Sequence, residues 1–277
     1  MLDADKAINS YSEFIKQFPG LINSPEIPNS IYPDDVPVLS GTGVHLMISS
    51  FPKSASRFFI DLFVGSNKLT EVNLNLALRA VESESLDVGY LAANHQFNYV
   101  THLHTRCYNT LPLKLLAFSI RTIILTRNIY DVIVSAKEHL DKSEHMAHII
   151  RTPKEYKSFD DIKKYDFLID YFVPWLFGFY ASWKNAVENN WVLASWVNYS
   201  DLITATDKVI QKVSDELKIE LFDGDIKNMC KYAKYKKSNF NVGLPGRGKK
   251  KLNDSQIEKI LYLKSFYTEY KMDELFD

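Results

Sequence analysis

Residues 51–59, with the sequence Phe-Pro-Lys-Ser-Ala-Ser-Arg-Phe-Phe, carry side chains well suited to bind an anion. They follow an apolar run at 44–48 and lead into an amphipathic segment at 58–64, an order typical of strand, loop and helix. A lysine, two hydroxyl groups and the backbone N–H groups of a helix N-terminus together favour phosphate or sulfate. No G-x-x-x-x-G-K-[ST] sequence precedes the helix, so this is not a Walker A motif. The alternative is a polar turn that caps the helix through Ser54 or Ser56.

A second anion-binding pattern begins with a short apolar run at 122–126, typical of a buried strand. Arg127 follows it directly, and Asn128 can cap the next helix. The apolar positions of that helix recur at helical spacing and are Ile129, Val132, Ile133, Ala136 and Leu140. Arg127 supplies a fork of N–H donors and Ser135 a hydroxyl donor, so the two can converge on one phosphate group. We expect Asp131 to support this site rather than touch the ligand, because a carboxylate repels a phosphate.

A third segment, 240–252, is rich in glycine and basic residues. Gly243 to Lys249 satisfies G-x-x-x-x-G-K, but Lys250 occupies the Ser/Thr position and no apolar strand precedes it, so we reject a P-loop NTPase. Eight basic and no acidic residues lie between Lys231 and Lys251, with aromatic residues interleaved, a pattern compatible with single-stranded nucleic acid. Because the rest of the chain is then net acidic, we favour a loop above an anionic cofactor and expect no nucleic-acid partner.

In this order, the three segments resemble the motifs of sulfotransferases that use 3′-phosphoadenosine 5′-phosphosulfate (PAPS). That family's 5′-phosphosulfate loop usually reads Tyr-Pro-Lys-Ser-Gly-Thr-Thr-Trp, and here Phe51, Ala55, Arg57 and Phe58 replace its Tyr, Gly, second Thr and Trp. The Arg-Asn-x-x-Asp-x-x-x-Ser pattern at 127–135 resembles the family's 3′-phosphate motif.

The late loop of the family, Phe-Arg-Lys-Gly-x-x-Gly-x-Trp-Lys, closes over the nucleotide and matches this chain less well. Asn241 and Val242 replace its two basic residues, and Gly248 replaces its tryptophan. Arg247 is the best candidate to supply the missing charge, because a guanidinium can bind phosphate with two parallel hydrogen bonds. The Tyr-Ser-Asp-Leu sequence that begins at Tyr199 resembles the family's Tyr-Glu-Asp-Leu, whose tyrosine lies near the adenine.

The resemblance implies a cofactor site and a catalytic base. The cofactor-binding residues it implies are Lys53, Ser54, Ala55, Ser56, Arg57, Phe58, Arg127, Ser135, Tyr199, Arg247, Gly248 and Lys249. Phe58 would stack on the adenine, and Arg57 would either contact the phosphosulfate or point to solvent. Val-Thr-His-Leu at 100–103 resembles the family's Lys-Thr-His-Leu, which makes His102 the expected base. Lys53 is expected to stabilise the negative charge that develops on the leaving group.

His104 competes with His102 for the role of base, because residues two apart lie on the same side of an extended chain. The alternative for His102 is a hydrogen-bonded core histidine. A His-x-His pair also resembles half of a zinc site, but the sequence offers no third ligand at metal spacing nearby, and we expect no metal.

Strands that alternate with helices predict an α/β fold of three layers, in which helices flank a central parallel β-sheet, as in P-loop-like nucleotide-binding folds. We expect one domain over 1–277, with an irregular lead-in at 1–43. Strands are expected at 44–48, 97–101, 122–126 and 191–197, and helices at 58–66, 73–85, 128–140, 166–189, 201–218, 223–236 and 254–270.

Composition agrees with a compact enzyme. Hydrophobic residues make up 46% and the net charge is −1, which argues against a disordered chain. The two cysteines, Cys107 and Cys230, are expected to be reduced thiols, and no signal peptide or membrane helix is predicted, so we expect a cytoplasmic protein without a membrane partner.

The resemblance implies in-line transfer of a sulfuryl group from PAPS to the hydroxyl or amine of a small-molecule or glycan acceptor. Aromatic residues crowd 167–180 and predict either an acceptor pocket or simply a buried helix. Two other classes stay open: a phosphotransferase of nucleoside-kinase type and a non-catalytic nucleotide-binding module. The sequence does not predict the acceptor or the oligomeric state.

Overall fold

The computed structural model describes residues 43–74, 85–108, 110–142, 146, 149–220, 223–236 and 246–276. The expected lead-in falls almost wholly outside these residues, as do 75–84 of the helix expected at 73–85 and loop residues 240–245. The strands are β1 (His45–Ser50), β2 (Thr70–Glu71), β3 (Tyr99–Leu103), β4 (Ile120–Thr126) and β5 (Ala194–Asn198).

All pairings among these strands are parallel, in the order β2-β3-β1-β4-β5, which confirms the expected α/β fold. β1 is central and wholly buried, as expected of a strand covered on both faces. In its register, Ile48 lies opposite His102 on β3 and Ile123 on β4. The carboxyl ends of these three strands therefore meet at one edge of the sheet, where ligands bind in open α/β sheets.

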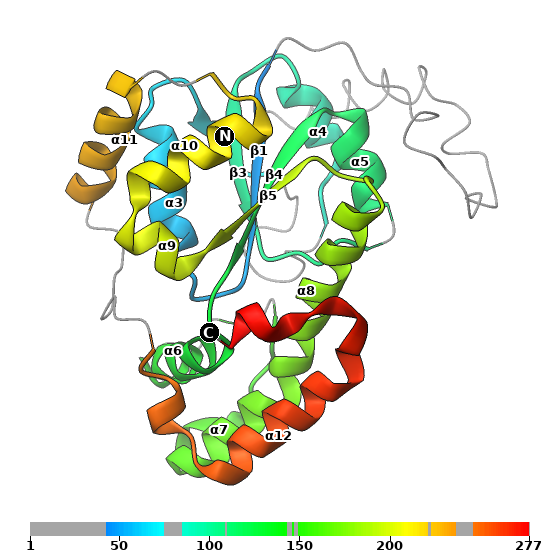
Figure 1. The fold of residues 1–277 in the computed structure, drawn as a ribbon, viewed down its shortest axis with the longest axis vertical. Helices are drawn as coiled ribbons and strands as arrows, with labels where there is room; N and C mark the ends of the chain where they lie inside the picture. The colour runs from blue at the N-terminus through cyan, green and yellow to red at the C-terminus, as the bar shows by residue number, and fades with distance from the viewer. Residues whose placement is uncertain are drawn as a thin grey trace, which may run out of the picture.

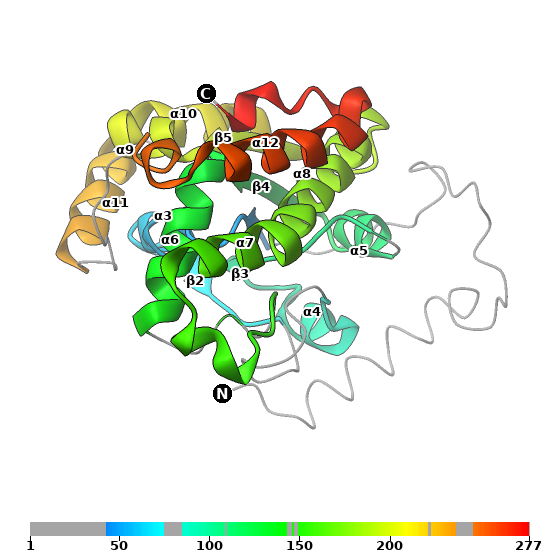
Figure 2. The same cartoon turned by 90° about the horizontal axis from the view of Figure 1, so that it is seen from below.

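Helices cover both faces of the sheet (Figures 1 and 2). One face carries α3 (Ser56–Val64), α10 (Thr206–Leu217) and α11 (Asp223–Tyr235), and the other carries α4 (Val88–Asn94), α5 (Leu111–Ala117) and α8 (Val173–Glu188). Alternate residues of β1 feed the two layers: Leu46 and Ile48 pack in the core beneath α3, and Met47 packs in the core beneath α8.

A group of helices extends beyond the carboxyl ends of the strands (Figure 1). It comprises α6 (Ile129–Lys142), α7 (Asp161–Tyr171) and α12 (Asp254–Lys264), with the short helices η2 (Lys154–Ser158), η3 (Lys249–Lys251), η4 (Ser265–Tyr270) and η5 (Met272–Leu275). α12 starts with a capping box in which Asn253 and Gln256 exchange hydrogen bonds between side chain and backbone. These helices form a wall beside the sheet edge at which the anion-binding segments meet.

Three of the expected helices are each divided in the structure, and the one expected at 254–270 is α12 followed by the 3-10 helix η4. The helix expected at 166–189 is α7 followed by α8, because Pro174 in the first turn of α8 cannot continue the preceding helix. The helix expected at 201–218 is α9 (Tyr199–Thr204) followed by α10. Helices α4 and α5 and the two-residue strand β2 were not expected, since their apolar runs are too short to give a clear periodicity.

Candidate functional site

The loop between β1 and α3 is shaped to face an anion. Lys53 and Ala55 both adopt left-handed backbone conformations, with φ of 66° and 64°. Ala55 is the residue that precedes α3, and it provides no side-chain cap to the N–H groups at the start of the helix. Ser54 is fully buried, and its hydroxyl has no hydrogen-bond partner among the described residues. The structure therefore argues against the alternative in which Ser54 or Ser56 caps the helix.

Positive charge converges on this loop. Burial lowers the pKa of Lys53, and the charges of Arg127 and Lys142 lower it further, with Glu138 opposing them. A lysine among other cations costs free energy in the free protein, which an anionic ligand would recover. Lys142 was not expected here. It is the last residue of α6, which continues two residues beyond the helix expected at 128–140.

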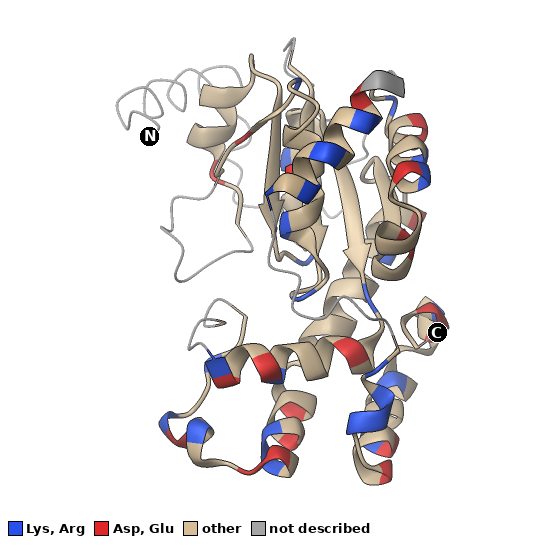
Figure 3. Cartoon of the chain, turned by 90° about the vertical axis from the view of Figure 1, so that its left-hand side faces the viewer, with Lys and Arg blue, Asp and Glu red and all other residues tan. Residues whose placement is uncertain are grey.

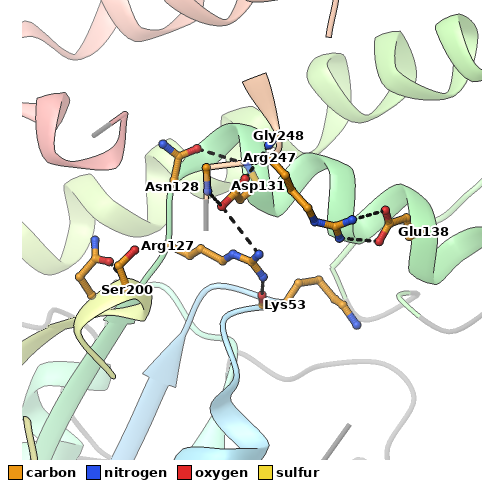
Figure 4. Close-up of polar contacts among 10 residues, drawn as sticks. Lys53, Arg127, Asn128, Asp131, Glu138, Ser200, Arg247 and Gly248 are labelled. Carbon is orange, nitrogen blue, oxygen red and sulfur yellow. Dashed lines mark hydrogen bonds and ion pairs between the residues drawn. The ribbon is translucent and has the colours of Figure 1, made fainter. Parts of the chain in front are cut away.

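Arg127 joins the second anion-binding pattern to the first (Figure 4). Its Nη1 donates to the backbone oxygen of Lys53 at 2.7 Å, and its Nη2 lies 3.8 Å from Oδ2 of Asp131. The guanidinium stacks on the ring of Tyr199, 4.0 Å from the ring centroid. Its Nε is buried without a hydrogen-bond partner among the described residues. A buried donor of this kind calls for an acceptor, and a phosphate oxygen would supply one.

The other residues expected at the nucleotide lie around this pair. Ser135 is buried on α6, two turns beyond Arg127. Tyr199 begins α9 directly after β5. Its ring contacts the guanidinium of Arg127, one of the residues expected at the 3′-phosphate. Phe58 is half-buried in the first turn of α3.

Both candidate bases contact Ser50, the last residue of β1. Nε2 of His102 lies 2.9 Å from Oγ of Ser50. Nδ1 of His104 donates to the backbone oxygen of Ser50 at 2.8 Å and lies 3.2 Å from its Oγ. The two imidazole rings meet edge to face, with centroids 4.6 Å apart. Ser50 was not expected at the site, although its place at the end of β1, three residues before Lys53, was a usable signal.

The late loop is fixed to α6 where the structure describes it (Figure 4). The backbone N–H groups of Gly246 and Gly248 donate to the carboxylate of Asp131, and the Arg247 guanidinium forms two hydrogen bonds with Glu138. Lys249 lies beside the ring of Tyr130, the residue before Asp131, with Nζ 6.0 Å from the centroid. Phe240, Asn241, Val242 and Gly243, which carried the rest of the expected loop motif, lie outside the described residues.

Arg57 makes two ion pairs that neither sequence expectation included. Its guanidinium donates to both carboxylate oxygens of Glu71 on β2 and to Asp61, one turn along α3. The side chain is 52% exposed, yet it is held at the protein surface by two carboxylates rather than by solvent alone. Its side chain thus forms a link between α3 and β2.

The basic residues near the end of the chain do not form one surface. Lys231, Lys234 and Lys236 lie exposed on or just after α11, whereas Lys249–Lys251 form η3 beside α6, so the two groups belong to different parts of the molecule (Figures 1 and 3). A continuous track for nucleic acid is therefore not formed by these described residues.

The aromatic segment is largely core. Four of its aromatic side chains are fully buried: Phe172, Phe177, Phe179 and Tyr180. Phe179 packs edge-on against Phe51 and so supports the anion-binding loop from beneath. This placement favours the buried-helix interpretation for most of the segment.

Three further observations bear on ligands and surroundings. Cys107 and Cys230 are both free thiols. Within the described ranges, no three His, Cys, Asp or Glu side chains are grouped so as to hold a metal ion. None of the helices described has the length and apolar character needed to cross a membrane.

Comparison with known proteins identifies the family. A model of the sulfotransferase domain matches residues 44–243, well over half of the 277-residue chain. The fold is similar to that of a mouse sulfotransferase, SULT7A1, solved in complex with PAP (3′-phosphoadenosine 5′-phosphate). The TM-score is 0.58, and the match covers 80% of this chain and 83% of that one. The two sequences are 14% identical, so this likeness concerns the fold alone, and no curated protein sequence matches the chain. By the family model and the shared fold, the chain belongs to the sulfotransferase domain family.

Proposed function

We propose that this protein transfers a sulfuryl group from PAPS to a hydroxyl or amine of a small-molecule acceptor. The observation that carries the proposal is that two buried donors at one cationic sheet edge, Ser54 Oγ and Arg127 Nε, have no hydrogen-bond partner in the part of the chain that the structure describes. Buried donors are rarely left unpaired in proteins, and two such donors beside Lys53 fit a ligand with two anionic groups.

The donor nucleotide would be held at two points. We propose that the N–H groups at the start of α3, together with Lys53, Ser54 and Ser56, bind the 5′-phosphosulfate, which the buried hydroxyl of Ser54 supports. Arg127 and Ser135 would bind the 3′-phosphate, supported by their burial two helical turns apart. Phe58 and Tyr199 are proposed as contacts of the adenosine part, since any base can stack on an aromatic face.

Lys53 is the proposed electrophilic partner of the leaving group. In-line transfer breaks the bond from sulfur to the bridging oxygen and places negative charge on the departing 5′-phosphate. A protonated ammonium near that oxygen would stabilise the charge as it develops. The neighbouring cations Arg127 and Lys142 add to the positive potential at this point.

His102 is the proposed general base. It would take the proton of the acceptor hydroxyl or amine as the acceptor atom attacks sulfur. Its ring is held by Ser50, in the segment that also carries Lys53, so β1 sets the position of the base and of the cation together. His104 shares the same partner and is the alternative base.

A thermal-shift titration in buffer with EDTA tests the donor. PAP at one hundred times its dissociation constant should stabilise the protein by about 2.7 kcal/mol, with no requirement for magnesium. ATP, which lacks a 3′-phosphate, should stabilise it far less. Stabilisation by ATP with magnesium and none by PAP would overturn the proposal and point to a phosphotransferase. Binding of PAP without sulfuryl transfer to any of a panel of phenols, alcohols and amines would point to a non-catalytic module.

A further inference from the structure

The late-loop residues 246–248 are fixed to one face of α6 by two carboxylates. Oδ2 and Oδ1 of Asp131 accept hydrogen bonds from the N–H groups of Gly246 at 2.8 Å and Gly248 at 2.7 Å. Glu138 accepts hydrogen bonds from both Nη atoms of Arg247, at 2.8 and 2.6 Å, while the Nε of Arg247 is buried with no hydrogen-bond partner among the described residues. Asp131 and Glu138 are seven residues apart, so both project from the same side of the helix. Three successive loop residues are therefore held at two points, two turns apart (Figure 4).

The contact with Asp131 is strongly constrained by burial. The Asp131 side chain is 1% exposed, and a buried carboxylate is tolerated only where charges or hydrogen bonds compensate it. The two loop N–H groups provide hydrogen bonds, and Arg127 provides charge from 3.8 Å. If the loop left this position, the carboxylate would lose both N–H donors, and Arg127 would be its main remaining source of compensating charge. The position of the loop and the environment of Arg127 are therefore linked through Asp131.

Gly248 permits this approach. A Cβ atom at this position would lie 2.2 Å from the carbonyl carbon of Tyr130 and 2.4 Å from the backbone nitrogen of Asp131. Both neighbours belong to the backbone of α6 and cannot move aside without distorting the helix. Any other residue would keep the loop further from α6 and lengthen the hydrogen bond to Asp131. The contact therefore depends on the glycine at this position, where the sequence resemblance leads one to expect tryptophan.

We propose that Asp131 and Glu138 are positioning residues which hold residues 246–248 against α6 and so form one wall of the nucleotide site, with Arg247 as the anchor of the loop rather than a direct phosphate contact. This inference rests on the proposed function, because the wall matters only if Arg127 receives the 3′-phosphate. Burial lowers the pKa of Arg127, and the positive charge of Arg247 lowers it further, so the anchored segment lies within electrostatic reach of that arginine. Hydrogen bonds from Arg247 lower the pKa of Glu138, so this anchor is ionised at neutral pH.

The decisive variant is Glu138→Gln, because the two possible roles of Arg247 predict opposite results. If Arg247 is an anchor, losing the carboxylate loosens the loop and PAP should bind about fivefold more weakly, as in Arg247→Ala. If Arg247 instead contacts phosphate, the same change removes a competing anion and PAP should bind more tightly. Glu138 and Arg247 are 28% and 24% exposed, so these variants are expected to fold. Tighter binding by Glu138→Gln would overturn the inference.

Two further variants sharpen the test. The charge-swapped double variant Glu138→Arg with Arg247→Glu rebuilds the ion pair, so it should recover most of the lost PAP affinity if the pair is an anchor. It should be weaker than either single variant if Arg247 contacts phosphate, and that result would refute the anchor. Lys251→Ala is the matched control, because Lys251 is an exposed residue of the same basic segment, and its loss should change PAP affinity less than twofold.

A measurement without nucleotide separates failure of this inference from failure of the proposed function. Hydrogen exchange of the free protein should show protected amides at Gly246 and Gly248, and Glu138→Gln should speed their exchange at least several-fold. Unchanged exchange in this variant would refute the anchor whether or not PAP binds. Protected amides in a protein that binds no PAP would retain the anchor and refute the proposed function instead.

Discussion

Replacing Arg127 tests the assignment of the 3′-phosphate most directly. In the free protein this guanidinium donates to the backbone of Lys53 and stacks on Tyr199, while its Nε has no hydrogen-bond partner among the described residues. Losing one charge-assisted contact to a phosphate costs about 1.5–3 kcal/mol, which corresponds to about 10- to 150-fold in affinity. We therefore expect Arg127→Ala to weaken PAP binding by a factor in this range.

The comparison ligand is adenosine 5′-monophosphate, which shares everything with PAP except the 3′-phosphate. Its affinity should change less than about threefold in Arg127→Ala, because the interaction with the 5′-phosphate is retained. The substitution should leave the fold intact, since Asp131 keeps its hydrogen bonds from Gly246 and Gly248.

Isothermal titration calorimetry of both ligands gives the ratio directly. Arg127→Lys is an informative control, because lysine keeps the charge but lacks the fork and should recover only part of the loss. Equal losses for PAP and adenosine 5′-monophosphate in Arg127→Ala would refute the assignment and indicate a general role for Arg127 in shaping the loop around Lys53.

Three other predictions concern the base, the cation and the strained loop. His102→Ala should abolish sulfuryl transfer and leave PAP affinity within about twofold, measured by product formation and calorimetry; if His104→Ala does this instead, the base is His104. Burial and neighbouring cations lower the pKa of Lys53 in the free protein, and a bound anion raises it again, so PAP affinity should be constant below the free-protein pKa and fall as pH rises through it. Lys53→Arg should flatten that dependence, and a fall of equal size in this variant would assign it to another group. Ala55→Gly should raise the free energy of unfolding by about 0.5–1 kcal/mol in urea titrations, because glycine relieves the left-handed strain at this position, and a loss of stability would contradict that account.

Local patterns predicted much of the sheet and both anion-binding segments. Each depends on residues adjacent in sequence: an apolar run, then a polar turn, then a helix of matching periodicity. The segments around Lys53 and Arg127 fold as expected, because a parallel sheet brings the carboxyl ends of its strands together. His102, by contrast, was expected only from the resemblance to the family's Lys-Thr-His-Leu motif, and the structure has it on β3, which pairs with β1.

Contacts between distant parts of the chain could not be predicted in this way. The bond from Gly248 to Asp131 joins residues 117 apart in sequence, and the Arg247–Glu138 pair joins residues 109 apart. The sequence neighbours of Asp131, Glu138 and Arg247 do not distinguish a charged side chain that forms these contacts from one that is exposed to solvent. The partner of Arg57 was missed for a similar reason: Glu71 lies on a two-residue strand too short to show a pattern.

The segment from Ser50 to Lys53 explains how one strand end can organise both halves of the proposed chemistry. The hydroxyl of Ser50 and its backbone oxygen hold the two histidines, and three residues later the backbone oxygen of Lys53 holds Arg127. The chain between them turns through the left-handed conformation of Lys53, which a lysine adopts only at a cost in free energy. That cost is offset by the buried core around Phe51, whose N–H donates to β4 and whose ring packs on α8. The short, strained connection from Ser50 to Lys53 would therefore keep the proposed base and the proposed cation close together, as in-line transfer would require.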